Sequence, residues 1–174
     1  MIALRLNRSA KDSERLARLL DFAKEVVGIC NDLGIEPVLS GSLAVLAYTQ
    51  NENISVNDID LSCEGKHFGA IIRRLDSEGI AHVLKEWHVL QVWRDDLKVE
   101  FDAQEHWLGD MPEERELLCV EGFQVNMVSL DYLRELYQRG LDDTAAQDDE
   151  NSQEKHAALK VKYDALSECV EHRV

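Results

Sequence analysis

The first long apolar pattern of the chain repeats at intervals of three and four residues from about residue 10 to residue 33, which predicts an amphipathic helix. Its buried face would consist of Leu16, Leu19, Leu20, Ala23, Val26, Val27 and Cys30. Ser9 and Asp12 have the spacing of a capping box, and Gly34 stands where a helix C-cap is expected. We therefore expect one N-terminal helix of about six turns.

Shorter patterns follow this helix. The segments predict in turn a buried strand (36–40), a short apolar helix (42–49), a polar loop (50–56), a second strand (56–63) and a helix (66–77) that ends at Gly79. The alternation of strands and helices favours helices packed against a sheet.

From Ile80 the apolar period changes to two, which is typical of strands. The expected elements are strands at 81–84, 88–93 and 97–104 with a hairpin turn at 94–96, a hairpin of strands 117–120 and 123–128, a helix that Ser129 caps and that ends near 139, an acidic linker at 142–153, and a last helix at 152–169. The predicted fold class is α+β: a mixed sheet with packed helices and a C-terminal helical extension. The core would span 1–128 and the extension 129–174, and we expect the two to form one structural unit.

Composition limits the possible partners. The chain has 174 residues with 45% hydrophobic residues, enough for one core, and 34 acidic against 19 basic residues give a net charge of −15. Such a charge disfavours nucleic acid and anionic membranes, although a basic stretch runs from Arg5 to Arg18. Four scattered cysteines suggest reduced thiols, and no signal peptide or long apolar run is seen. We expect a soluble cytoplasmic protein without a membrane segment.

Two carboxylates stand at alternate positions in the second predicted strand, at Asp58 and Asp60. Alternate residues of a strand project from the same face, so the two side chains would lie side by side and repel each other. A cation bound between them would remove that repulsion, and oxygen ligands suit magnesium. Upstream, Gly41 and Ser42 form a small turn after an apolar run, which suggests a phosphate near the predicted metal site.

A site for two cations usually needs a third carboxylate from a neighbouring strand. The strand at 97–104 offers Glu100 and Asp102 on one face, with apolar residues on the other. Glu100 lies nearer the middle of the strand, and Asp102 remains a rival.

In this order, the Gly-Ser turn, the Asp-x-Asp strand and the acidic strand resemble the DNA polymerase beta-like nucleotidyltransferase superfamily, and most of all its small bacterial members: minimal nucleotidyltransferases and antibiotic adenylyltransferases. The resemblance covers roughly 35–107. It implies that Gly41 and Ser42 bind the triphosphate of an NTP and that Asp58 and Asp60 bind two Mg²⁺ ions.

The same resemblance implies that Glu100 or Asp102 activates the acceptor hydroxyl, and that Glu100 is also a metal ligand. It further implies that Lys155 in the helical extension reaches the nucleotide. The turn departs from the family pattern, since the apolar residues 43–46 follow it where a basic residue is common. The charge that neutralises the phosphates would then come from Lys66, Arg73 or Lys155.

The function that this resemblance implies is magnesium-dependent transferase activity that moves a nucleoside monophosphate from an NTP, such as ATP, to an acceptor hydroxyl. A small antibiotic-like acceptor is one option, and a cationic one would be drawn to the acidic site. The alternatives are a toxin-type enzyme that acts on tRNA or a protein, and an inactive nucleotide-binding or regulatory relative. The protein would be a monomer or a homodimer. Three tryptophans near the sheet are expected to pack in the core or at its rim, or to line an acceptor pocket: Trp87, Trp93 and Trp107.

Overall fold

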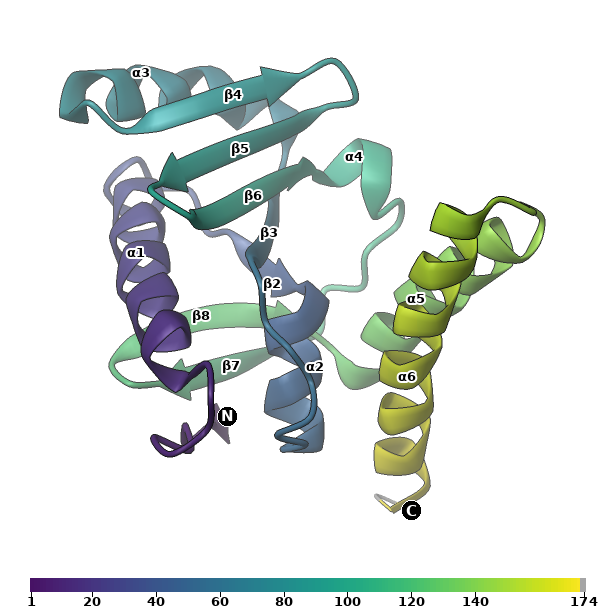
Figure 1. Cartoon of the computed structure of the whole chain (residues 1–174). Helices are drawn as coiled ribbons and strands as arrows, with labels where there is room; N and C mark the ends of the chain where they lie inside the picture. Colours follow the sequence, from purple (N-terminus) through teal and green to yellow (C-terminus); the bar gives the residue numbers. More distant parts are fainter. Residues whose placement is uncertain (173–174) are drawn as a thin grey trace.

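Eight strands form one mixed sheet in the order β1-β7-β8-β2-β3-β6-β5-β4 in the computed structural model, which describes residues 1–172 (Figure 1). The strands are β1 (Ile2–Ala3), β2 (Val38–Ser40), β3 (Ile59–Cys63), β4 (Ala81–Lys85), β5 (Val89–Arg94), β6 (Leu97–Ala103), β7 (Arg115–Val120) and β8 (Phe123–Val128). The helices are α1 (Ser13–Asp32), α2 (Gly41–Thr49), α3 (Phe68–Glu78) after a short 3₁₀ turn (Gly65–His67), α4 (Gln104–Trp107), α5 (Leu130–Ala145) and α6 (Glu150–His172). The α+β class and the mixed sheet that the sequence predicts are confirmed.

The sheet contains both parallel and antiparallel pairs of neighbouring strands. Three neighbouring pairs are parallel: β1 with β7, β2 with β8, and β3 with β6. The other pairs are antiparallel, including the three hairpins β4–β5, β5–β6 and β7–β8. The parallel pairing of β3 with β6 brings two acidic segments that are far apart in the sequence to the middle of the sheet.

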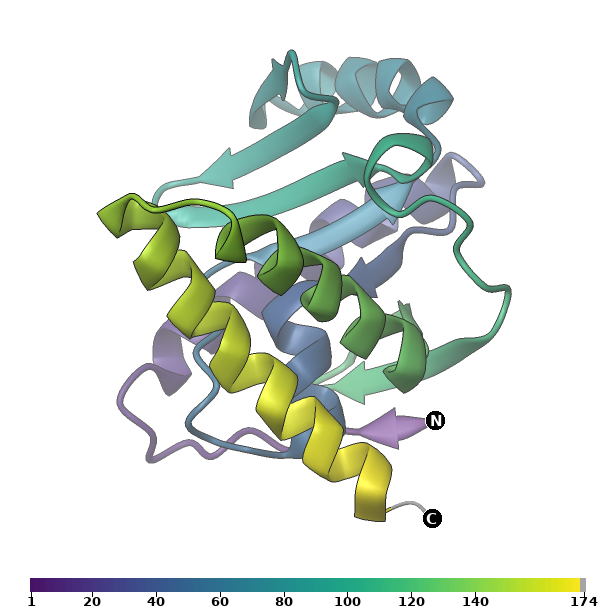
Figure 2. The same cartoon turned by 90° about the vertical axis from the view of Figure 1, so that its right-hand side faces the viewer.

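The two faces of the sheet are covered by different helices. Helices α1 and α3 lie on one face, and α2, α5 and α6 lie on the other (Figures 1 and 2). Burial raises the pKa of Cys30 in α1 to about 12, and the nearby Cys63 adds to that rise. Cys63 therefore faces α1, so by strand alternation Asp60 and Ser62 face the side of α2, α5 and α6.

Several element boundaries differ from the sequence prediction. The first inner strand begins at Val38 rather than at 36, because the preceding Pro37 has no N–H to donate. The second begins at Ile59, so Asp58 lies just before β3. Helix α5 continues to Ala145, so the acidic linker is confined to 146–149. The elements β1 and α4 were not predicted, since two to four residues carry no measurable period.

The N-terminal helix start was also predicted wrongly. Helix α1 begins at Ser13, and Asp12 occupies the N-cap position without a side-chain hydrogen bond. Ser9 lies in the preceding turn, too far from the first helical turn to cap it, and its hydroxyl donates to the side chain of Asn7. The predicted capping by Ser129 is confirmed, because its hydroxyl accepts a hydrogen bond from the Tyr132 N–H. Gly34 and Gly79 have the expected left-handed backbone after α1 and α3.

No helix in the described part of the chain is long and apolar enough to cross a membrane.

Helices α5 and α6 form an antiparallel pair that packs over α2 (Figure 2). Leu166 of α6 is fully buried and belongs to the same hydrophobic cluster as the sheet residues Leu39 and Phe101. Tyr137 of α5 is also part of this cluster. The C-terminal extension thus shares its apolar contacts with the rest of the core, which supports our proposal that the chain is one structural unit.

We expect Leu166→Ala to lower the free energy of unfolding of the whole protein by about 2–4 kcal/mol, because it leaves a cavity in the shared core. Val161→Ala in the same helix, where the side chain is 59% exposed, should change it by less than about 0.5 kcal/mol. Urea unfolding followed by circular dichroism and by tryptophan fluorescence measures both. A separate early transition of the helices in Leu166→Ala would contradict the one-unit proposal.

Candidate functional site

The Gly-Ser turn lies directly against Asp60. Strand β2 ends at Ser40, which is paired with Asp60 across the antiparallel β2–β3 ladder, and helix α2 begins at the next residue, Gly41. Gly41 has φ +67°, and a Cβ atom on it would lie 1.9 Å from Asp60 Oδ2. Only glycine fits there, for both its backbone conformation and the close approach. The N-terminus of α2, whose unpaired N–H groups attract anions, is therefore held beside this carboxylate.

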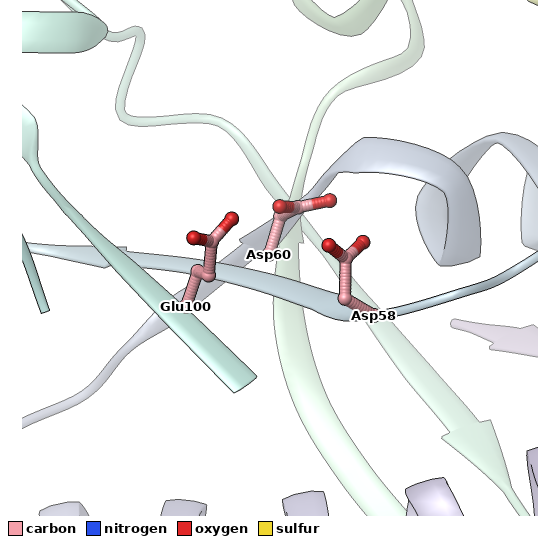
Figure 3. A group of neighbouring side chains, drawn as sticks. All are labelled: Asp58, Asp60 and Glu100. Carbon is pink, nitrogen blue, oxygen red and sulfur yellow. The ribbon is translucent and has the colours of Figure 1, made fainter. Parts of the chain in front are cut away.

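The register of β3 and β6 gathers the predicted carboxylates. Asp60 is paired with Glu100, and Ser62 is paired with Asp102. Asp58, Asp60 and Glu100 each offer a carboxylate oxygen, and these oxygens all lie within 4.8 Å of one another. Figure 3 shows the three side chains projecting from the same side of their strands. Three clustered carboxylates form the hard oxygen donor set that Mg²⁺ prefers, so these residues fit the metal that the sequence predicts.

Asp102 shares this face but lies two residues further along β6, beside Ser62, and is outside the three-carboxylate group. Burial, and then the charges of Glu100 and Asp58, raise the pKa of Asp102 to about 6. A carboxylate that titrates this near neutrality is suited to accept a proton. The structure thus separates the two rivals by position: Glu100 lies in the cluster, and Asp102 lies beside it.

Two polar side chains that the sequence did not indicate as site residues contact the three-carboxylate group. Lys98 Nζ lies 3.0 Å from Asp58 Oδ2 and 3.2 Å from Glu100 Oε1. Gln91 Nε2 donates a hydrogen bond of 2.6 Å to Glu100 Oε2. Lys98 stands two residues before Glu100, so the same alternation that grouped the carboxylates would have placed it on their face.

Asp60 is the most strongly perturbed carboxylate of the group. Burial, and then the negative charges of Asp58, Asp102 and Glu100, raise its pKa to about 7 against a smaller opposing effect of Lys98. The cluster therefore resists full ionisation in the absence of an additional cation. This unrelieved repulsion among the carboxylates supports the interpretation of the cluster as a metal site.

Tyr137 from α5 closes the site on the side of Ser42, which is buried. The pKa of Tyr137 is raised, first by burial and then by the charge of Asp60, while a hydrogen bond with Ser42 opposes the rise. Lys162 from α6 lies over the aromatic ring of Tyr137, with Nζ 5.9 Å from the ring centroid. The helical extension thus reaches the site through Tyr137, a contact that no local sequence pattern indicated.

The structure does not bring the three cations that the sequence predicted for phosphate binding close to the carboxylates. Lys155 is exposed on α6 and makes no ion pair or hydrogen bond within residues 1–172. Arg73 is exposed on α3, which covers the opposite face of the sheet, and Lys66 pairs with Glu64. Of the lysines in α6, Lys162 is the one in contact with a residue of the site.

The three tryptophans lie at different places. Trp93 is half-buried on the same face of the sheet as the carboxylates, because it is paired with Lys98. Trp87 and Trp107 are 54% and 50% exposed, and the indole N–H of Trp107 donates to the Trp87 carbonyl oxygen. None of the three belongs to the buried core, so of the expected places the core is excluded, and rim packing or an acceptor pocket stays a prediction.

Comparison with known proteins supports the fold. No protein-family model and no curated protein sequence matches the chain. Among solved structures, it is similar to an antigenic nucleotidyltransferase-like protein from Paracoccidioides brasiliensis, with 15% identity, a TM-score of 0.59, and coverage of 85% of this chain and 74% of that one.

Two antibiotic-modifying proteins are also similar in structure. The solution structure of the antibiotic-resistance factor ANT(2'')-Ia has 15% identity, a TM-score of 0.58 and coverage of 91% of this chain and 93% of that one. The lincosamide antibiotic adenylyltransferase LnuA, solved with lincomycin bound, has 11% identity, a TM-score of 0.50 and coverage of 82% and 95%. At these identities the likeness establishes the nucleotidyltransferase fold.

We expect Gly41→Ala to destabilise the protein by at least about 1 kcal/mol more than Gly34→Ala. Both glycines have a positive φ, so both substitutions introduce backbone strain of about 1 kcal/mol. Only at Gly41 does the new methyl group meet a side chain, since nothing lies within 4 Å of a Cβ at Gly34. Urea unfolding of the two variants measures the difference, and equal losses would refute the close approach to Asp60.

The raised pKa of Asp60 predicts a pH-dependent loss of stability in the metal-free protein. Below about pH 4 both the folded and the unfolded chain hold the proton, and between pH 4 and about 7 only the folded chain does. This contribution to folding stability is therefore lost as the pH rises through about 7.

Asp60→Asn should raise the free energy of unfolding at pH 8, by up to about 4 kcal/mol, and should leave it nearly unchanged at pH 3.5. Asp143→Asn, at an exposed position on α5, is the matched control and should show no such pH dependence. Denaturation in the presence of a chelator measures both variants. A gain of stability at pH 3.5 equal to that at pH 8 would show that Asp60 is not strained by its charge.

Proposed function

We propose that this protein is a magnesium-dependent nucleotidyltransferase that transfers a nucleoside monophosphate from an NTP to an acceptor hydroxyl and releases pyrophosphate. The observation that carries the proposal is the joint position of two features in a nucleotidyltransferase fold. The carboxylate group of Asp58, Asp60 and Glu100 lies beside the helix N-terminus at Gly41 and Ser42. The carboxylates suit divalent cations, and the helix N-terminus suits phosphate.

Asp58, Asp60 and Glu100 would hold two Mg²⁺ ions, and bound Mg²⁺ would withdraw charge from the phosphate oxygens. Gly41 and Ser42 would donate the first N–H groups of α2 to the triphosphate. The acceptor oxygen would attack the α-phosphorus in line as the bond to the bridging oxygen breaks, and pyrophosphate would leave.

The acceptor proton would pass to a carboxylate of β6. Asp102 supports this role by its raised pKa and by its position beside the three-carboxylate group. Glu100 is the rival, but Lys98 and Gln91 already contact its two oxygens. We therefore propose Glu100 as the third metal ligand and Asp102 as the first candidate for the base.

The basic partner of the nucleotide would come from α6. The resemblance drawn from the sequence points to Lys155, but the contact with Tyr137 favours Lys162. Tyr137 contacts both Ser42 and Lys162, so Lys162 shares a neighbour with the turn that would bind the triphosphate.

A small hydroxylated cation is the acceptor class that the charge favours, since the net charge is −15 and the site itself is acidic. ANT(2'')-Ia has been solved with adenylyl-2''-tobramycin and LnuA with lincomycin, so antibiotics are the first acceptors to test. A toxin-type reaction on tRNA or protein and a nucleotide-binding role without turnover remain the alternatives. A cytoplasmic location and a monomeric or homodimeric state remain predictions.

The proposal is tested with α-³²P-labelled NTPs, Mg²⁺ and a panel of aminoglycosides and lincosamides. We expect transfer of label to one acceptor class, with activity reduced about 100-fold or more in Asp58→Asn, Asp60→Asn and Asp102→Asn. Asp102→Asn should retain Mg-NTP binding in isothermal titration, whereas Asp60→Asn should weaken it. Asp143→Asn is the control for the loss of one negative charge.

If Glu100→Gln retains metal and nucleotide binding but loses turnover, while Asp102→Asn retains turnover, the two β6 roles are reversed. Absence of Mg-NTP binding by the unmodified protein, with Asp58→Asn and Asp60→Asn indistinguishable from it, would refute the proposed function.

A further inference from the structure

The ammonium group of Lys98 lies between two of the three residues that offer metal ligands. Its Nζ atom is 3.0 Å from Asp58 Oδ2 and 3.2 Å from Glu100 Oε1. The ladder that pairs Asp60 with Glu100 starts at the pair Ile59–Val99, and Asp58 and Lys98 directly precede these two residues. The contact therefore lies at the end of the β3–β6 ladder, where the pairing of the two strands brings both residues together.

The charge balance of this face depends on Lys98. Four carboxylates lie on it, those of Asp58, Asp60, Glu100 and Asp102, and within residues 1–172 Lys98 is the cation that pairs with any of them. Its side chain is only 21% exposed. One ammonium cannot offset four carboxylates, which agrees with the raised pKa values of Asp60 and Asp102.

An ammonium and a divalent cation compete for this position. Mg²⁺ binds carboxylate oxygens at about 2.0–2.1 Å, closer than an ammonium nitrogen. Lys98 Nζ already contacts one oxygen of Asp58 and one of Glu100, and Gln91 Nε2 contacts the other oxygen of Glu100. A metal ion bound by both carboxylates would therefore meet the ammonium at a short separation, and the strong repulsion between the two positive charges favours movement of Lys98 away from them.

The structure offers Lys98 a place to move to. The ring of Trp93, its cross-strand neighbour on β5, has its centroid 5.6 Å from Nζ. An indole face attracts an ammonium, although less strongly than two carboxylates do. Lys98 would thus rest on the carboxylates in the metal-free protein and on Trp93 when a metal is bound.

We propose that Lys98 is the internal counter-ion of the metal-free site, which a divalent cation must displace, so that Lys98 lowers the intrinsic affinity for the metal and stabilises the site without it. This inference rests on the proposed function, since it takes the three-carboxylate group as the metal site.

The test is Mn²⁺ binding without nucleotide, followed by the electron paramagnetic resonance of free Mn²⁺ at low ionic strength. We expect Lys98→Gln, which retains hydrogen-bond donors to both carboxylates, to bind Mn²⁺ about tenfold more tightly than the unmodified protein. Lys98→Met is the second variant, with no donor at all. Lys85→Met, on the same face of neighbouring β4 but with no ion pair to a carboxylate within residues 1–172, is the control and should match the unmodified protein.

A second readout is thermal denaturation with a chelator and with saturating Mn²⁺. The midpoint should rise more upon metal addition in Lys98→Gln than in the unmodified protein, because the variant lacks the internal cation in the metal-free state. If Lys98→Gln binds Mn²⁺ no more tightly than the unmodified protein and Lys85→Met, the counter-ion proposal is overturned.

These outcomes distinguish the two proposals. Mn²⁺ binding that is lost in Asp58→Ala but unchanged in Lys98→Gln leaves the metal site standing and removes only the role of Lys98. Absence of Mn²⁺ binding in every variant overturns the counter-ion proposal, and the proposed function is also overturned if Mg-NTP binding is absent. If Lys98→Gln weakens Mg-NTP binding and leaves Mn²⁺ binding unchanged, Lys98 is a phosphate ligand instead.

Discussion

Repulsion among the carboxylates on β3 and β6 is the constraint on which the site depends. The parallel pairing that sets Asp60 beside Glu100 concentrates negative charge where burial makes ionisation unfavourable. The protein moderates this charge with Lys98 and Gln91, which both contact Glu100. The remaining imbalance would favour binding of a divalent cation, as the proposed function requires, and so it links the stability of the sheet to the proposed chemistry.

Space around Asp60 is the second constraint. Gly41 leaves room for its carboxylate, and the first turn of α2 brings unpaired N–H groups to the same place. Tyr137 from the C-terminal extension closes the third side. An acidic cluster thus lies against a helix N-terminus, and the pair could accommodate a metal ion and a phosphate at neighbouring positions.

Most of the helices and strands followed from the period of apolar residues, because period is a local property of the chain. The failures have local causes as well. Ser9 has the residue type of an N-cap but lies too far from Ser13, and Pro37 delays the start of β2. The predicted lysine, Lys155, was chosen by position along a helix, whereas contact with the site depends on how α6 packs over Tyr137.

The sequence by itself determined which side chains share a face: Asp58 with Asp60, and Lys98 with Glu100 and Asp102, since alternate residues of an extended chain always point the same way. Only the tertiary structure decided that these two faces adjoin, that Asp60 is opposite Glu100, and that Gly41 abuts Asp60. The register between distant segments is set by the burial of their apolar faces against α1, which no short stretch of sequence encodes. The Gly-Ser turn and the Asp-x-Asp motif therefore lie together only in the folded chain.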